Sequence, residues 1–415
     1  METALPEDRL ARRLTLTDAV VIGLGAMIGA GIFAAPGPAA EAAGSLLFIG
    51  LALAGIVAYA NATSSAQLAA VYPESGGTYV YARERLGPYW GLLAGWGFVI
   101  GKTASLAAMA LTLGSYAYPD LAKPIAISAV VVLTAVNYLG VQKTAALTRV
   151  LVGVVLSVLA LVVVAALSGG TVSPERLDAG PSRGPLDVLQ SAGLLFFAFA
   201  GYSRIATLGE EVVQPEVTIP RAIPIALGGV IVVYASVLGA VLLAIGPETI
   251  ARSPAPLAAA IEAGRWSQIA PLVRAGAAVA AAGVLLSLLA GVSRTALSMA
   301  RRGDLPRFLA AVHRTYRTPH HAELVSGVLV IVIVAVADLR GAIGFSSFAV
   351  LTYYALTNAA SWTLPADQRR WPRWLTVTGL LGCIVLALTL PREAVLGGIL
   401  LLAVGSLVWL VRTWK

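Results

Sequence analysis

The chain has 415 residues, of which 58% are hydrophobic and 12% are charged. A soluble domain carries about twice that share of charged residues to cover its surface, so the composition excludes a soluble globule and predicts an integral membrane protein. The formal net charge of +8 would also suit a nucleic-acid partner. The distribution of the basic residues along the chain distinguishes a nucleic-acid-binding protein from a membrane protein.

Twelve apolar runs are long enough to cross a bilayer, which takes about 20 helical residues. The polar connections between them are too short to hold a core of their own. We therefore expect an all-α fold of twelve transmembrane helices in one membrane domain, residues 1–415. The predicted spans are 18–43, 45–71, 90–118, 124–139, 147–168, 187–209, 222–246, 268–300, 323–338, 342–364, 374–390 and 394–411.

An even number of spans puts both termini on the same side of the membrane. With both termini in the cytoplasm, the inner connections carry about twice as many lysines and arginines as the outer ones, as the positive-inside rule requires. The basic charge thus indicates orientation in the cell membrane, and we reject a nucleic-acid partner. A cleavable signal peptide is the alternative for the first run, but its core at 20–33 contains four glycines and eleven further spans follow.

Cysteine and histidine usage predicts neither a disulfide nor a bound metal. Cys383 has no partner cysteine, and His313, His320 and His321 share one polar stretch without metal-ligand spacing. We expect no cofactor. The sequence shows neither the paired carboxylates nor the nucleophile with its base that would indicate a membrane enzyme. It shows no charged ring or filter motif that would indicate a channel, and a channel remains an alternative function.

The first and sixth spans differ from the others because glycines interrupt them. The first contains Gly29 and Gly31 before a helix-stopping P36-G-P38, and the sixth contains Gly201 within FFAFAGYSRIATLGEE, residues 196–211. Five spans separate their starts, so they run in opposite directions, as in transporters built from inverted repeats. We expect repeats at 18–168 and 187–364, with two helices appended at 374–411.

Each break would expose backbone groups that are costly to leave bare in a membrane. A zwitterionic ligand can satisfy them: free amides at the start of a half-helix would face a carboxylate, and free carbonyls at the end of the other half would face an ammonium group. The alternative is that the glycines only let two helices pack closely.

Four longer motifs, in order along the chain, resemble the amino acid–polyamine–organocation (APC) superfamily of secondary transporters. They are GAGIF at 29–33 in the first helix, the loop and third-helix entry at 72–96, the sixth helix and its loop at 196–223, and the end of the eighth helix at 293–319. The resemblance implies a LeuT-type fold of two five-helix inverted repeats, with helices one and six broken. It also implies alternating-access transport of a small amino acid driven by protons. Exchange of amino acids or amines without proton coupling stays open.

The resemblance also implies where the substrate binds. Amides of the first break would hold its carboxylate. Carbonyls of both breaks would hold its amine, and Phe197 would form an aromatic lid. The implied substrate-binding residues are Met27, Ile28, Gly29, Ala30, Gly31, Phe197, Ala200 and Gly201.

Three positions depart from the family pattern. Leu288 stands where some relatives have a large aromatic gate. Val155 stands where proton-coupled relatives often have a lysine in the fifth helix. Ser203, followed by Arg204, stands at a sixth-helix position that is often acidic. If protons drive transport here, another titratable group has to carry them.

We expect three basic residues, Lys102, Arg204 and Arg294, to remain inside the membrane, where a charge costs at least about 2.5–3.5 kcal/mol. Lys102 continues the close-packing face of Gly91, Gly95 and Phe98, so we expect it to point into the bundle. We predict that it couples protons to transport, because a buried lysine can lose its proton whereas arginine keeps it. The alternatives are a structural lysine bonded to helix-end carbonyls and a contact with an acidic substrate.

The other two, Arg204 and Arg294, lie in the inner halves of spans six and eight. We assign them to an inner gate, with Asp18 at the start of span one as a candidate partner for one of them. A buried structural contact or direct substrate contact explains the two arginines equally well.

Overall fold

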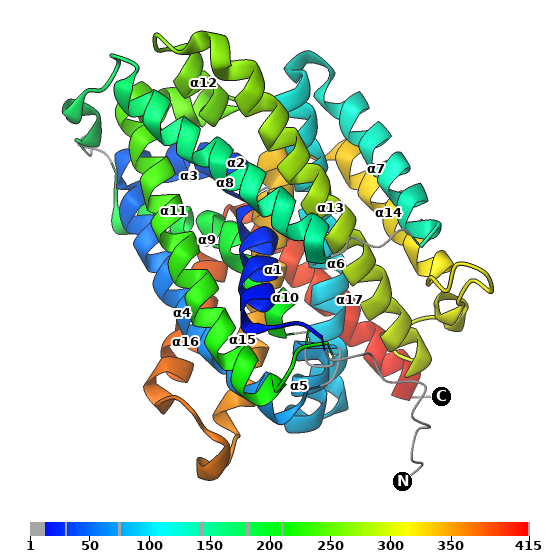
Figure 1. The fold of residues 1–415 in the computed structure, drawn as a ribbon. Coiled ribbons are helices and arrows are strands. Elements are labelled where there is room, and N and C mark those ends of the chain that lie inside the picture. Colours follow the sequence, from blue (N-terminus) through cyan, green and yellow to red (C-terminus); the bar gives the residue numbers. More distant parts are fainter. Residues whose placement is uncertain are drawn as a thin grey trace.

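The protein is folded from helices that run side by side as a bundle, and α1 begins and α17 ends at the same end of it, the lower end in Figure 1. This structure, a computed structural model, describes residues 13–413 except 30, 74–75, 141–144, 179–182, 207 and 209–210. Within these ranges the only β pairing is an isolated bridge between Leu14 and Val212. The helices are α1 (Leu16–Ile28), α2 (Gly31–Ala34), α3 (Pro36–Ala43), α4 (Leu47–Val71), α5 (Thr78–Leu86), α6 (Pro88–Ala117), α7 (Ala122–Tyr138), α8 (Ala145–Ser168), α9 (Pro185–Phe199), α10 (Ser203–Ala206), α11 (Pro215–Arg252), α12 (Pro256–Glu262), α13 (Ala270–Arg301), α14 (His320–Val336), α15 (Leu339–Trp362), α16 (Arg373–Leu388) and α17 (Arg392–Thr413).

Nine helical stretches of the described chain are long and apolar enough to cross a membrane. The three remaining predicted spans correspond to α14, α15 and α16. Of these, α14 and α16 are apolar but have only 17 and 16 residues, whereas α15 is long but buries polar side chains such as Thr357 and Asn358. The count of twelve spans therefore stays a prediction.

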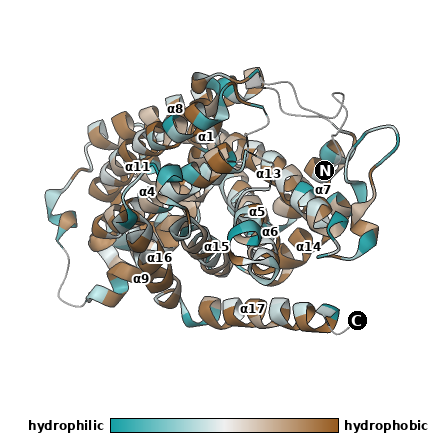
Figure 2. Cartoon of the chain, turned by 90° about the horizontal axis from the view of Figure 1, so that it is seen from below, coloured by the Kyte–Doolittle hydropathy of each residue, from teal (hydrophilic) through white to brown (hydrophobic). Residues whose placement is uncertain are grey.

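Apolar side chains also cover much of the outside of the bundle, where brown colour dominates the helices in Figure 2. On α14, for example, Val328, Val332 and Val336 are 59%, 51% and 80% exposed. They lie four residues apart and so form one stripe of the helix. Lipid tails rather than water suit such a surface, which agrees with the composition.

The interruptions of the first and sixth spans lie where the sequence predicts them. The first helix ends at Ile28 and helical structure resumes at Gly31. In the sixth span, a 3-10 turn (Ala200–Tyr202) separates α9 from α10. Helical structure stops at Ala34, just before Pro36, as the sequence predicts, and Pro36 then begins a further helix, α3, which continues to Ala43. Proline is well tolerated in a first helical turn, where its missing N–H has no intrahelical partner to lose.

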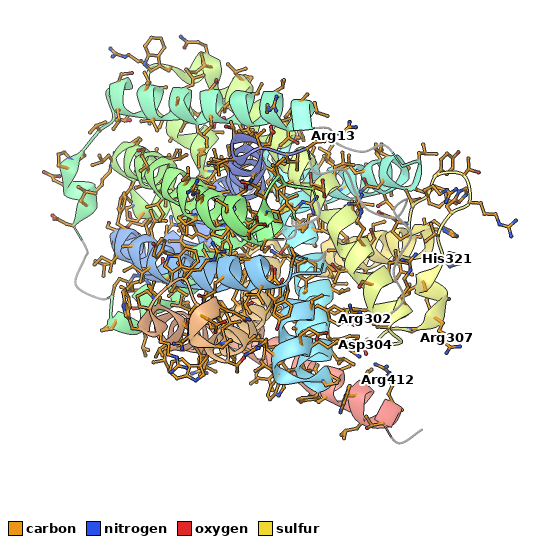
Figure 3. The ribbon with its side chains drawn as sticks, turned by 60° about the horizontal axis from the view of Figure 1, so that its bottom comes forward. Arg13, Arg302, Asp304, Arg307, His321 and Arg412 are labelled. Carbon is orange, nitrogen blue, oxygen red and sulfur yellow. The ribbon has the colours of Figure 1, made fainter. Side chains whose placement is uncertain are left out.

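At the lower end, one buried carboxylate ties three helices together. Asp304, just after α13, is 2% exposed and accepts hydrogen bonds from Tyr79 and Arg83 of α5 and Arg412 of α17, at 2.5, 2.8 and 2.8 Å. Figure 3 views this end, where Asp304 and Arg412 lie close together. The last helix is thereby fixed to the bundle.

Candidate functional site

The two broken helices contact each other at their breaks. A Cβ on Gly31 would lie 2.5 Å from the Ala198 Cα atom, and one on Gly201 would lie 2.7 Å from the Met27 nitrogen. Tyr234 of α11 joins the same two segments, because its hydroxyl lies 2.6 Å from the Met27 carbonyl and 3.0 Å from the Ala198 carbonyl. The close-packing role that the sequence left open therefore applies to both glycines.

The Ala200 carbonyl, at the end of α9, is surrounded by donors from the protein itself. The Tyr354 hydroxyl of α15 lies at 3.0 Å, Ser203 Oγ at 3.2 Å and Lys102 Nζ at 3.4 Å. Sequence reasoning placed the substrate amine at this carbonyl and missed the two tyrosine hydroxyls, Tyr234 and Tyr354, that satisfy the breaks. A signal for them existed, because a tyrosine buried in an apolar span needs a hydrogen-bond partner.

Lys102 points into the bundle, as its helix face predicts. It is 6% exposed and lies on α6 opposite the break in the sixth span. Its contact with Ala200, the residue that caps α9, is the helix-end bond of the structural alternative. The same contact places an ammonium group at the carbonyl where we expect the substrate amine to bind. The contact is therefore compatible with a structural lysine and with a lysine that couples protons to transport.

Next to the breaks lies a cavity of about 390 Å³, within the usual range for small-molecule sites. It extends from Gly31 and Lys102 to Leu14 and the exposed Arg317 at the end where α1 begins. Aromatic side chains in its wall are Phe98, Phe197 and Tyr353. The predicted site residues that line it are Met27, Gly31, Lys102, Phe197, Ala200, Gly201, Ser203, Arg204, Leu288 and Arg294.

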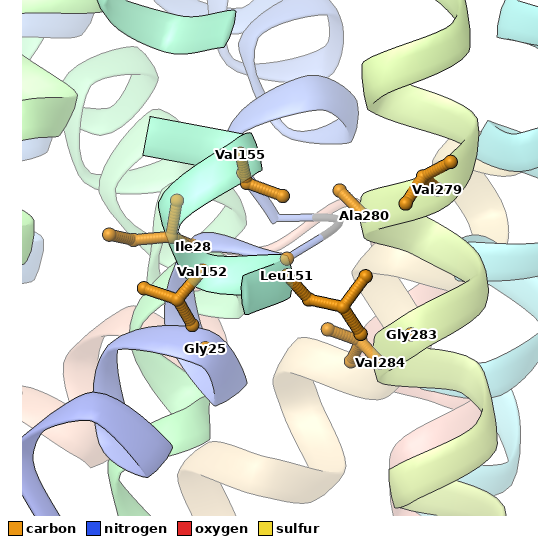
Figure 4. A pocket seen from close by; sticks show the side chains of 10 residues that line it. Gly25, Ile28, Leu151, Val152, Val155, Val279, Ala280, Gly283 and Val284 are labelled. Atoms are coloured by element: carbon orange, nitrogen blue, oxygen red, sulfur yellow. The ribbon is translucent and has the colours of Figure 1, made fainter. Parts of the chain in front are cut away.

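Two predicted substrate residues line a different space. Ile28 and Gly29 face a small cavity of about 20 Å³ between α1, α8 and α13, with Val155 and Val284 in its wall (Figure 4). That volume holds about one water molecule. Val155, where the family pattern places a lysine, thus lies beside the first break. The predicted carboxylate site is therefore divided, and its middle residue, Ala30, lies outside the described residues.

At the end of α6 away from Leu14 and Arg317, the rings of Phe33 and Tyr116 meet edge to face at 5.5 Å, and the Tyr116 hydroxyl donates to the Phe33 carbonyl. That hydroxyl also accepts a hydrogen bond from the Leu257 amide on α12, 3.3 Å away. Both rings are buried and neither lines the large cavity, whose described lining reaches the exposed Arg317.

The expected pairing of Asp18 with Arg204 or Arg294 is wrong. Asp18 forms a capping box with Thr15 at the start of α1 and an ion pair with Arg149 of α8. The capping box fixes the carboxylate toward α8, and the sequence could not show that α8 begins beside it. Arg204 and Arg294 instead line the large cavity.

Sequence reasoning missed one buried acid altogether. Glu323, in the first turn of α14, is 2% exposed and lines the large cavity. Glu323 is the first residue of the predicted span 323–338, a position at which an acid is usually solvated, so the sequence carries no signal of its burial.

Comparison with known proteins places the chain among transport proteins. A family model described as amino acid permease matches residues 14–404. An uncharacterized transporter of Mycobacterium tuberculosis is 59% identical over 405 residues, which cover 98% of this chain and 92% of that protein. A branched-chain amino acid permease of Bacillus subtilis is 24% identical, covering 99% and 94%. A methylthioribose transporter of the same species is 29% identical, covering 77% and 74%.

Proposed function

Because the chain belongs to the amino acid permease family, we propose that it is a secondary active transporter that moves a small amino acid across the cell membrane, coupled to protons. It is a transporter and not an enzyme. We further propose the LeuT-type architecture, with repeats at 18–168 and 187–364 and the last two helices, 374–411, appended.

The observation that carries this proposal is the position of the large cavity. It lies against both helix breaks and extends to the end of the bundle at Leu14 and Arg317, whereas the buried rings of Phe33 and Tyr116 pack together beyond the breaks and do not line it. A binding site reached from one side at a time is what alternating access requires. With both termini in the cytoplasm, this conformation faces inward.

The contacts at the breaks support a substrate with a free amine. The Met27 carbonyl accepts one bond from Tyr234, which leaves a lone pair for a substrate ammonium. At Ala200, by contrast, a substrate ammonium has to displace Lys102, the most distant of its three donors. Such a displacement would link substrate binding to the position and protonation of Lys102, which is the coupling that we propose.

The cavity wall supports a neutral, apolar substrate side chain. Phe98, Met109, Phe197 and Leu288 supply apolar surface near the breaks. The name of the branched-chain relative agrees with this choice. The name of the methylthioribose relative shows that transport within the family is not confined to amino acids, so that sugar belongs in any substrate screen.

Uptake into liposomes that contain the purified protein tests the proposal. Each standard amino acid and methylthioribose are supplied in labelled form, with protein-free liposomes as the control. We expect saturable, stereoselective uptake of a small apolar amino acid. Uptake of methylthioribose alone would contradict the proposed substrate class, and uptake that rises linearly with concentration would indicate a channel.

A further inference from the structure

Glu323 has one carboxylate oxygen that is satisfied and one that is not. The Ser293 hydroxyl of α13 donates to Oε1 at 2.7 Å. Oε2 is buried and has no hydrogen-bond partner in the described part of the chain. The residue forms none of the ion pairs found there either, although Arg294 follows Ser293 and lines the same cavity.

A bare, buried carboxylate oxygen is expensive to keep ionised. It is relieved when a proton or another cation binds to it. The break carbonyls have donors such as Tyr234 and Tyr354, whereas Oε2 of Glu323 is a buried polar atom on the cavity wall without a hydrogen-bond partner among the described residues.

The surroundings of Glu323 favour a proton over a larger cation. Among the described residues, those with a charge that line the cavity are four basic and two acidic ones: Lys102, Arg204, Arg294, Arg317, Glu211 and Glu323. A metal ion or a substrate side-chain ammonium would enter a region of its own charge and would need several oxygen ligands. A proton bonds to one oxygen and needs no further ligand.

Several titratable groups approach Glu323 from the elements around it. The helices packed against α14 carry Arg294 on α13, Lys102 on α6 and Tyr138 at the end of α7. Arg307 lies in the neighbouring 3-10 turn (Arg307–Ala310), and His320 and His321 precede Glu323 on its own helix. Of all the groups named in this paragraph, only Glu323 is a wholly buried acid that also forms part of the cavity wall.

We propose that Glu323 binds and releases a proton during transport, as a second protonatable group between Lys102 and the open end of the cavity. The proton passes from cavity water to Oε2, forming an O–H bond, and the neutral carboxyl keeps its bond from Ser293. On release, the carboxylate becomes available to Arg294. This inference rests on the proposed proton-coupled transport and adds a residue and a step to it.

Glu323→Gln tests the proposal, since it keeps the shape and the acceptor for Ser293 but cannot lose a proton. Glu262→Gln, which alters an exposed glutamate at the opposite end, is the matched control. In liposomes we compare exchange of the best-transported amino acid at equal pH, its accumulation under a pH gradient, and proton movement reported by an entrapped dye. We expect Glu323→Gln to keep exchange and to lose at least about tenfold in accumulation together with the proton signal.

Each outcome separates this inference from the proposed function. Accumulation and proton movement at the wild-type level in Glu323→Gln overturn it. Exchange without any proton movement in the wild type overturns it too, while amino acid transport stands. If Glu323→Gln loses accumulation and proton movement while Lys102→Met couples normally, the result supports the proton site at Glu323 and contradicts the coupling role of Lys102.

Infrared difference spectra provide a readout that does not depend on transport. The wild type should show the carbonyl band of a protonated carboxyl that titrates with pH and is missing in Glu323→Gln. If the two spectra are identical, the inference is wrong even where the variant transports poorly.

Discussion

Lys102 is the residue at which the proposed substrate site and the proposed coupling site coincide. Its ammonium lies 3.4 Å from the Ala200 carbonyl, in the wall of the cavity. Replacing it by methionine keeps the apolar stem and removes the charge. We expect Lys102→Met to exchange amino acid but to lose accumulation driven by a pH gradient, measured in liposomes.

A matched control is available on α7. Lys123→Met removes an exposed lysine that donates to a carbonyl near the opposite end of the bundle, Ala335, 3.0 Å away. It should accumulate substrate normally. Accumulation by Lys102→Met at the level of this control would show that Lys102 is only a structural lysine.

Tyr234 offers a second prediction, about what holds the breaks together. In Tyr234→Phe the carbonyls of Met27 and Ala198 lose their shared donor while the ring stays packed. An unsatisfied buried carbonyl costs about 1–3 kcal/mol, so we expect a lower unfolding temperature and weaker binding of the transported amino acid.

Tyr202→Phe is the control for this experiment. Its hydroxyl is buried without a partner among the described residues, and its ring stacks on Tyr354 at 4.9 Å. Removing that hydroxyl should leave the unfolding temperature unchanged or raise it slightly. Equal losses in both variants would mean that the breaks do not depend on Tyr234.

At the scale of whole helices, the close contact of the two broken segments determines what Gly31 tolerates. The sequence alone predicts that Gly31→Val fills the space for the substrate carboxylate. The structure adds that the new Cβ would lie 2.5 Å from backbone of α9. Because backbone cannot rotate away, the helices must separate, at a cost of about 1–3 kcal/mol.

We therefore expect Gly31→Val to lose substrate binding and to unfold at a lower temperature, both measured on purified protein. Gly228→Ala on α11, where an added Cβ has open space, should leave both properties intact. Normal stability with abolished binding in Gly31→Val would instead favour a purely local block of the carboxylate site.

How far the sequence predicted the site depends on whether a feature is local to one helix. Glycine spacing located both breaks, and the periodicity of α6 gave the direction of Lys102. Contacts between distant helices could not be read that way. Arg149 rather than a cavity arginine pairs with Asp18, and Tyr354 reaches the Ala200 carbonyl from far along the chain.

Two further differences have physical reasons of their own. Pro36 begins a helix because a first turn needs no donor from it, so the same residue that stops one segment starts the next. The burial of Glu323 could not be predicted, because it stands at the start of a predicted span and is buried by contacts with another helix, on which Ser293 lies.

For the molecule as a whole, labelling of a cysteine in the cavity tests which side of the membrane the open end of the cavity faces. Positive charge on the connections predicts that both termini are cytoplasmic, so the end at Leu14 and Arg317 should face the cytoplasm. The native Cys383, on α16, is wholly buried against Asn61 of α4 and should react little with thiol reagents. The natural chain is thus a low background for an introduced cysteine.

Ser298→Cys places such a thiol on α13, in the wall of the cavity. A membrane-impermeant reagent should label it in inside-out vesicles and not in right-side-out ones, because the cavity extends to the end at Arg317 that we predict to be cytoplasmic. If transport alternates between two states, saturating amino acid should lower the labelling rate from the inner side as the cavity is occupied or closes. Labelling only from the outer side would reverse the orientation, and labelling from both sides at once would contradict alternating access.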